Sequence, residues 1–113
     1  MSNRSVITKY EGAVDGTSGY NEIARLLNRK HRRGTFRCIN RTSGSVTFRV
    51  RIADDDLEWT YYGASTTVVP GGVDEITTEW KDDNVILEAT GAVAGQVAIE
   101  EISPVEAYNT LGD

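Results

Sequence analysis

The sequence has only one cysteine, Cys38, among its 113 residues, so a single copy of the chain cannot form an internal disulfide. Small secreted domains more often carry an even set of cysteines. No apolar stretch of the signal-peptide kind follows Met1, and no hydrophobic run approaches the length that crosses a bilayer. We therefore expect synthesis in a reducing cytoplasm, no membrane partner, and a core that is stable without disulfides.

Residues suited to catalysis are equally scarce. His31 is the only histidine, and it lies in a run of basic residues whose charges lower its affinity for a proton. Cys38 has no histidine or oriented acid beside it in the sequence, so we interpret it as a small buried residue. The acidic run Asp54–Glu58 lacks the glycine that a calcium-binding loop of the EF-hand type requires. We predict that the protein is not an enzyme and has no cofactor, no metal site and no catalytic residues.

Acidic residues are scarce in the first half of the chain, and basic residues are scarce in the second. Residues 1–52 hold 11 of the 12 Lys and Arg residues but only 3 of the 17 Asp and Glu residues. The two halves therefore carry net charges of +8 and −13. Unless strands of the two halves alternate in the fold, this distribution predicts a molecule with one electropositive and one electronegative side.

Alternation of apolar and polar residues dominates the sequence after Gly34 and is typical of β-strands. The clearest example is SVTFRVRIA at Ser45–Ala53, and Pro70-Gly71-Gly72 is the strongest turn signal. The other predicted strands are Val6–Tyr10, Thr35–Asn40, Leu57–Tyr62, Thr66–Val69, Val73–Trp80, Asn84–Thr90 and Gln96–Ile102. This short spacing predicts an all-β, mainly antiparallel fold, namely a β-sandwich of about seven to eight strands.

One segment near the N-terminus has a helical period instead. Ile23, Leu26 and Leu27 stand at positions i, i+3 and i+4, and Asn21 is suited to cap a helix. The basic run before Gly34 suits the C-terminal end of a helix. We therefore predict one short helix at about residues 21–32. The predicted organisation is an N-terminal arm at 1–34 with a short strand and this basic helix, a β-sandwich at 35–103 and a C-terminal tail at 104–113.

Basic and aromatic residues are the candidates for an interface. Six Lys and Arg residues gather between positions 25 and 37, and they suit either an acidic protein surface or a nucleic acid. Tyrosine is enriched at protein interfaces, and two tyrosines are expected to be exposed. The predicted interface residues are Arg25, Arg29, Lys30, Arg32, Arg33, Arg37, Tyr62 and Tyr108.

Three aromatic residues of one predicted strand suggest another kind of site. Trp59, Tyr61 and Tyr62 would form a stacking platform for a carbohydrate or another ligand if their rings were exposed on one sheet face. Burial of these rings in the core is the alternative, since aromatic residues in strands more often pack inward. The exposure of each ring in the folded protein decides between the two interpretations.

A series of turn and strand motifs runs from Asn40 to Ile102. It begins with NRTSGSVTFRVR at Asn40–Arg51, continues through Val69-Pro-Gly-Gly72 and Ile86-Leu-Glu-Ala89, and ends with GQVAIEEI at Gly95–Ile102. These motifs resemble the small β-sandwich structural proteins of tailed bacteriophages. One departure is Lys81-Asp82-Asp83-Asn84, where such proteins usually carry a Gly-Asp turn. The first 34 residues contain no matching motif.

The resemblance implies a non-enzymatic virion protein, made in the host cytoplasm, that decorates the capsid, joins head to tail or belongs to the tail. Its partners would be capsid or tail proteins and further copies of itself in a symmetric homo-oligomer, a ring or a trimer. Two alternatives remain open from the residues alone. One is a carbohydrate- or ligand-binding β-sandwich module, and the other is a nucleic-acid-binding protein that uses the basic segment Arg25–Arg37.

Overall fold

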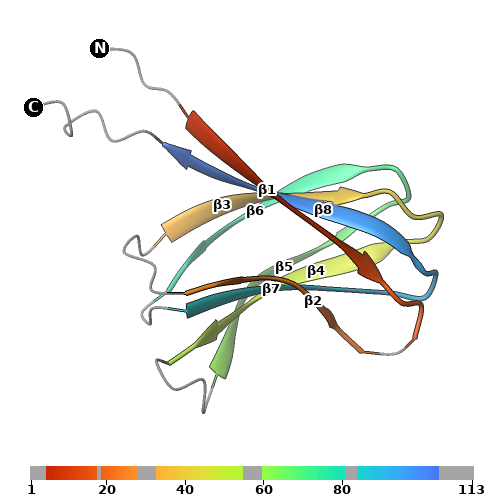
Figure 1. Ribbon diagram of the computed structural model, residues 1–113, viewed down its shortest axis with the longest axis horizontal. Coiled ribbons are helices and arrows are strands. Elements are labelled where there is room, and N and C mark those ends of the chain that lie inside the picture. The colour runs from red at the N-terminus through yellow and green to blue at the C-terminus, as the bar shows by residue number, and fades with distance from the viewer. Residues whose placement is uncertain (1–4, 18, 28–32, 55–59, 81–83, 105–113) are drawn as a thin grey trace, which may run out of the picture.

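The computed structural model describes residues 5–17, 19–27, 33–54, 60–80 and 84–104, and they form a β-sandwich (Figure 1). The strands are β1 (Ser5–Val14), β2 (Asn21–Leu26), β3 (Arg33–Asn40), β4 (Val46–Ala53), β5 (Thr60–Val68), β6 (Val73–Glu79), β7 (Asn84–Gly91) and β8 (Gly95–Pro104). Among these described residues, no helix is long and apolar enough to span a membrane.

The strands form two antiparallel sheets of four. Sheet A has the order β1-β8-β3-β6, and sheet B has the order β2-β7-β4-β5. Successive strands alternate between the sheets up to β4, and again from β5 to β8, and the first strand pairs with the last along its whole length. This order is that of a jelly roll, the two-sheet sandwich built from two Greek keys. The predicted all-β sandwich is therefore confirmed.

Alternation along the strands decides which side chains form the core. In β4, Val46, Phe48, Val50 and Ile52 are buried, while the residues between them are partly exposed on the outer side. The same pattern holds in β3, where Phe36 and the two alternate residues after it face inward. Burying an apolar side chain of this size stabilises the fold by about 1.5–3 kcal/mol. The two inner faces together thus hold the sheets against each other.

Every strand pairing in the jelly roll joins the first half of the chain to the second. In both sheet orders, strands from β1–β4 alternate with strands from β5–β8. Basic side chains therefore lie beside acidic ones, and the expected electropositive and electronegative sides do not form in the described part of the chain. Between described residues, four ion pairs link the halves: Arg37–Glu75, Arg37–Glu100, Arg49–Glu88 and Arg51–Glu88.

The predicted helix at residues 21–32 is wrong for the part that the structure describes, because Asn21–Leu26 is β2. A β-bulge between Glu22 and Ala24 explains the error. The bulge turns both Ile23 and Ala24 toward the core, so the inward residues of β2 fall at 23, 24 and 26. A strand interrupted in this way imitates helical spacing. Residues 28–32 of the predicted helix lie outside the described residues.

Both strands of the first 34 residues belong to the sandwich, β1 at the edge of sheet A and β2 at the edge of sheet B. The strand predicted at Val6–Tyr10 is also longer than expected, since β1 continues to Val14. Likewise, the described part of the strand predicted at Leu57–Tyr62 and most of the strand predicted at Thr66–Val69 belong to one strand, β5, whose register with β4 shifts between Arg49 and Arg51. Bulges and paired edges, which sequence patterns show poorly, account for these differences.

Asn40 holds the two sheets together at one end of the sandwich. Its side-chain amide nitrogen donates to the carbonyl oxygens of Gly44 at 2.7 Å, Val68 at 3.0 Å and Val69 at 3.2 Å. Its side-chain oxygen accepts from the backbone nitrogen and the hydroxyl of Thr42, both at 2.8 Å. Because Asn40 is buried, these bonds satisfy polar atoms that water cannot reach. The turn after β3 and the end of β5 are thereby fixed to each other.

Candidate binding surface

The candidate site lies on the outer face of sheet B, the side that points away from the core. Alternation and register place charged, aromatic and hydroxyl side chains of all four strands on this face. They are Glu22 and Arg25 of β2, Ile86, Glu88 and Thr90 of β7, Thr47, Arg49 and Arg51 of β4, and Tyr62, Ser65 and Thr67 of β5. The two central strands, β7 and β4, carry the most buried of these charges.

Glu88 is the anionic centre of this face. Its side chain is only 8% exposed, and its two carboxylate oxygens accept hydrogen bonds from Arg49 Nε at 2.9 Å and Arg51 Nε at 3.0 Å. A carboxylate this deeply covered needs such charge-assisted bonds to offset its desolvation. Glu88 therefore fixes the orientation of both guanidinium groups on the sheet.

Arg49 is also held by two aromatic rings. Its guanidinium carbon lies 3.6 Å from the centre of the Tyr20 ring and 4.1 Å from the centre of the Tyr62 ring. Such cation–π contacts contribute about 0.5–1 kcal/mol each at exposed sites. We call Tyr20, Arg49 and Tyr62 the Arg49 stack. Tyr62 is 58% exposed, so the stack presents an aromatic surface to solvent.

The loop between β1 and β2 brings Tyr20 over sheet B. Asp15 accepts hydrogen bonds from the backbone nitrogen of Thr17 at 3.0 Å and from the side-chain amide of Asn21 at 3.2 Å. Two hydrogen bonds from Thr17 lower the pKa of Asp15 below its usual value. The bond from the Thr17 hydroxyl has the larger effect, and the bond from its backbone nitrogen has the next largest. The hydroxyl of Thr90 donates to the carbonyl oxygen of Gly19 at 2.6 Å. These bonds tie the loop to β7, immediately before Tyr20.

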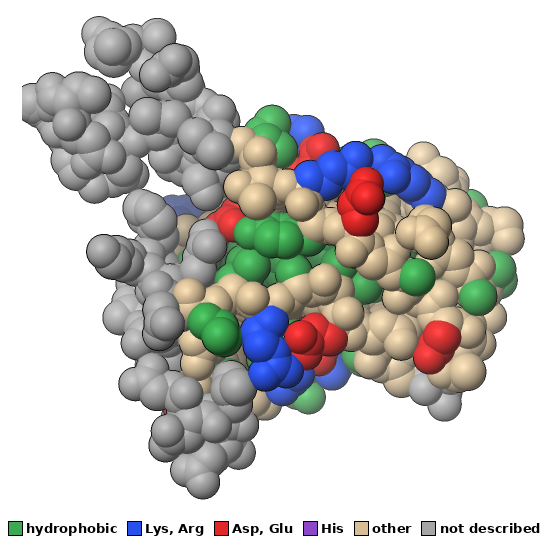
Figure 2. Space-filling model, viewed as in Figure 1, with side chains coloured by type: hydrophobic (Ala, Val, Ile, Leu, Met, Phe, Trp, Pro, Cys, Tyr) green, Lys and Arg blue, Asp and Glu red, His purple; other side chains and the backbone are tan. Residues whose placement is uncertain are grey.

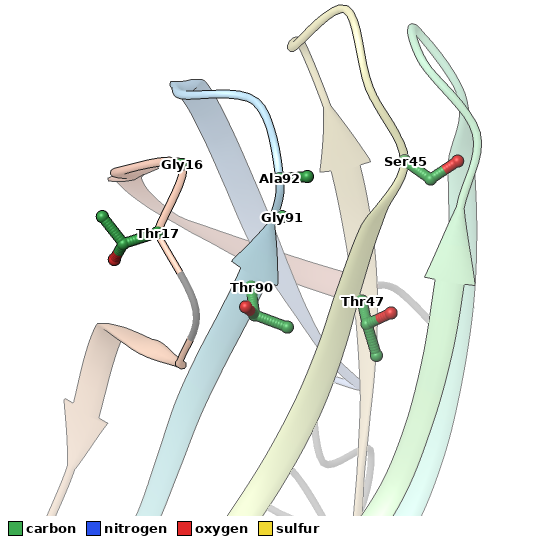
Figure 3. Close-up of a pocket in the computed structure, with 7 residues that line it drawn as sticks. All are labelled: Gly16, Thr17, Ser45, Thr47, Thr90, Gly91 and Ala92. Atoms are coloured by element: carbon green, nitrogen blue, oxygen red, sulfur yellow. The ribbon is translucent and has the colours of Figure 1, made fainter.

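An open hollow of about 430 Å³ continues the site toward one end of sheet B (Figure 3). It is formed by the loop after β1, the start of β4 and the end of β7. We call it the hydroxyl hollow, because four of its residues carry side-chain hydroxyls. The lining residues are Gly16, Thr17, Ser45, Thr47, Thr90, Gly91 and Ala92. Thr47 and Thr67 hydrogen-bond each other through their hydroxyls at 2.9 Å, next to the hollow.

The predicted basic residues lie on different faces of the sandwich. Arg25 is on the outer face of sheet B and forms an ion pair with Glu22 at 2.7 Å. Arg37 is on the outer face of sheet A, between Glu75 at 3.3 Å and Glu100 at 3.0 Å. Arg33 is the first residue of β3 and is exposed. Arg29, Lys30, Arg32, His31 and Tyr108 lie outside the described residues, so the interface role of the whole set stays a prediction.

The aromatic residues of β5 divide between the two faces of sheet B. Tyr61 packs against the core, whereas Tyr62 points outward to Arg49. Trp59 lies outside the described residues. Sequence reasoning missed Tyr20, which lies 42 residues before Tyr62 and which the loop after β1 brings to the guanidinium of Arg49. It also missed Glu88, whose only signal is an acidic residue inside the apolar strand NVILEAT.

The described residues offer binding groups rather than a reactive centre. Cys38 is fully buried, and burial, with a smaller contribution from Asp74, raises the pKa of its thiol to about 12. It therefore stays protonated and unreactive at neutral pH, as interpreted from the sequence. Within the ranges that the structure covers, no three His, Cys, Asp or Glu side chains are grouped as metal ligands would be. Stacking, hydrogen bonding and charge pairing are the interactions that this surface supplies.

No family model matches the sequence, and no curated protein matches it either. Several solved structures share the fold, each at 13% sequence identity. PirA has a TM-score of 0.66 over 82% of this chain and 92% of its own, and the SPBc2 prophage-derived protein YomS has 0.57 over 93% and 96%. A structure of Bacillus endospore appendages, described as disulfide-linked pili, has 0.52 over 93% and 90%. At this identity the likeness shows a common β-sandwich fold.

Proposed function

We propose that the chain is a non-enzymatic structural protein of a phage or prophage-derived particle, and that it binds another particle protein through the Arg49 stack. The observation that carries this proposal is the exposed Tyr62 ring on a guanidinium that Tyr20 and Glu88 already hold in place. The prophage-derived protein YomS supports it, because it shares the fold over nearly the whole of both chains. The motifs between Asn40 and Ile102 resemble proteins of the same source.

The composition of the stack suits a protein interface. Tyrosine and arginine are enriched at interfaces and among the residues whose truncation weakens binding most. Arg49 is ordered before any partner arrives, because two rings and a carboxylate fix its guanidinium. Little side-chain entropy is then lost on binding. A partner with an acidic or aromatic group at its centre would complement this surface.

Within the particle we assign the chain to capsid decoration, the head–tail junction or the tail, where it would bind capsid or tail subunits in repeated copies. A β-sandwich without reactive groups in its described part is suited to such a role. The endospore appendage structure supports the idea of repeated copies, since those appendages are described as disulfide-linked pili. The protein would then be found in the virion after synthesis in the host cytoplasm.

Mass spectrometry of particles purified from the organism that encodes the chain tests this proposal. We expect the chain at a fixed copy ratio to the major particle proteins. In a strain deleted for the gene, complementation with Tyr62→Ala or Arg49→Ala should yield particles that contain much less of the chain. Thr77→Ala, an exposed change on the outer face of sheet A, should be incorporated normally. Absence of the wild-type chain from the particles would refute the proposal.

A carbohydrate-binding role is the second candidate, because the hydroxyl hollow adjoins the Arg49 stack. An exposed aromatic ring next to hydroxyl and guanidinium donors is a common arrangement for holding a sugar. Native gel electrophoresis with soluble polysaccharides cast into the gel tests it directly. Retardation of the wild-type chain by one polysaccharide, lost in Tyr62→Ala but not in Thr77→Ala on the opposite sheet, would favour this candidate. Equal mobility in every gel would remove it.

A further inference from the structure

The free edge of β1 is a second interaction surface, separate from the Arg49 stack. β1 is the first strand of sheet A and pairs only with β8, so one side of its ten-residue backbone has no neighbouring strand among the described residues. Exposed edges of this length are templates for pairing with another chain, and proteins commonly protect them. β1 itself contains no proline, and no bulge interrupts its pairing with β8.

We propose that two copies of this chain pair through the free edges of β1 in an antiparallel manner, about a two-fold axis at Tyr10. The partner is therefore a second copy, and the two A sheets become one continuous sheet of eight strands. Residues 6–14 of one copy would pair with residues 14–6 of the other. Such pairing satisfies backbone donors and acceptors that otherwise bond only to water.

Charge fixes this register. Tyr10 packs toward the core, so its neighbours Lys9 and Glu11 lie on the outer face, where their side chains are 41% and 62% exposed. Within one copy, Lys9 Nζ lies 3.5 Å and Arg41 lies 3.8 Å from the same carboxylate oxygen of Glu11. With the axis at Tyr10, Lys9 of each copy also lies opposite Glu11 of the other, so two pairs between the copies add to those within each. An axis at Lys9 would place two lysines together, and one at Glu11 would place two glutamates together. Among antiparallel registers only the one centred on Tyr10 pairs these two residues.

The same register extends a pattern that already exists within each copy. The strand register places Lys9, Glu100, Arg37 and Glu75 in one row across the outer face of sheet A. Charges of opposite sign therefore alternate from β1 to β6. Glu11 of the second copy would continue the row on the far side of Lys9. Opposite-charge pairs between strands stabilise a sheet, whereas like charges directly opposite destabilise it.

The side of the molecule that carries β1 is also apolar enough to be covered. Figure 2 shows a band of hydrophobic side chains there, between two groups of charged side chains. Tyr10, Ile23 and Ala24 are only partly buried and pack against the core between the edge strands β1 and β2. Ile7 of β1 is 53% exposed. Covering such residues adds a hydrophobic contribution to the backbone pairing.

An interface of this kind uses the same patch on both copies and is complete with two of them. It gives a two-fold dimer rather than the ring or trimer expected from the sequence alone. A larger symmetric assembly would then be built from dimers through another surface, such as the Arg49 stack. The dimer can be measured with the purified chain, so its presence or absence is independent of whether the chain is found in a particle.

Charge reversal tests the dimer by sedimentation equilibrium of the purified full chain. Wild type should dimerise, and Lys9→Glu or Glu11→Lys should each raise the dissociation constant about tenfold, because each places like charges opposite each other twice. The double variant Lys9→Glu/Glu11→Lys restores both pairs and should return to within about threefold of wild type. A monomeric wild type, or single variants that dimerise as wild type does, would overturn the proposal.

Cysteine cross-linking tests the register. Opposite residues of antiparallel strands have Cα atoms about 4.5–5.5 Å apart, within the range of a disulfide. A mixture of Lys9→Cys and Glu11→Cys chains, mildly oxidised and then alkylated, should give a covalent dimer. Either variant alone should give much less, and the buried Cys38 does not compete. Cross-linking that is as efficient in Lys9→Cys alone would exclude the axis at Tyr10.

Discussion

The carboxylate of Glu88 accepts a hydrogen bond from Arg49 Nε at 2.9 Å and thereby joins the acidic second half of the chain to its basic first half. The jelly roll makes such contacts general, because each of its strand pairings combines one strand from each half. A net charge of +8 in one half and −13 in the other therefore becomes pairing across the sheets. If the two halves had formed separate domains, the same charges would instead have produced one basic and one acidic surface.

Glu88→Gln should destabilise the protein by about 2 kcal/mol, since it removes the charge between two arginines at a nearly buried position. Urea unfolding followed by fluorescence measures the change. Glu75→Gln is the matched control, because Glu75 pairs with Arg37 at an exposed position. Its cost should stay below about 0.5 kcal/mol. Equal effects of the two substitutions would contradict the central role of Glu88.

Asn40→Asp should lower the free energy of unfolding by about 3 kcal/mol or more. The substitution replaces the amide nitrogen that donates to three carbonyl oxygens with a carboxylate oxygen that repels them. Thermal denaturation monitored by circular dichroism gives the comparison. Ser43→Ala, in the same turn but exposed, serves as the control and should be close to neutral. An Asn40→Asp protein as stable as wild type would show that Asn40 does not hold the turns together.

Gly63→Ala should destabilise the protein by about 1–3 kcal/mol, because an added Cβ would lie 2.6 Å from the hydroxyl oxygen of Thr78. Gly63 lies in β5, and Thr78 is buried in β6 of the facing sheet. The double variant Gly63→Ala/Thr78→Ala removes the clash. We expect it to be at least about 1 kcal/mol more stable than the sum of the single effects. If the effects of the two substitutions on the free energy of unfolding were additive in chemical denaturation, the sheets would make room for the added Cβ at little cost.

The Cys38 thiol should resist alkylation in the native protein and react fully in denaturant, as mass spectrometry after iodoacetamide treatment would show. Burial raises its pKa to about 12 from its usual value of 9.0, so the unfolded chain loses the proton first as the pH rises. The contribution of this thiol to the free energy of unfolding is therefore complete below about pH 9. It falls by roughly 1.4 kcal/mol per pH unit as the pH rises toward 12. The stability of Cys38→Ala should not show this decrease between pH 9 and pH 12. If wild type and Cys38→Ala lost stability equally over this range, the prediction would be wrong.

Much of the fold follows from local patterns in the sequence. The alternation in Ser45–Ala53 predicts β4 and its inward residues, and similar patterns predict β3, β6, β7 and β8. The candidate site follows only in part. Alternation predicts that Arg49 and Tyr62 point away from the core, but not that they meet, because a bulge sets their register. Tyr20 could not be assigned, since a loop held by Asp15 and Thr90 brings it there.

Local patterns in the sequence were enough to predict that the chain forms strands, which residues of most strands face the core, and that the two halves carry opposite charge, because these properties depend on neighbours along the chain. The pairing of the strands, by contrast, is visible only in the folded protein. Because of this pairing, Ile23 and Ala24 belong to a bulged edge strand instead of a helix. The same pairing places Arg49 against the rings of Tyr20 and Tyr62. The physical reason is that pairing is set by backbone hydrogen bonds and packing between segments far apart in sequence, which no local period contains.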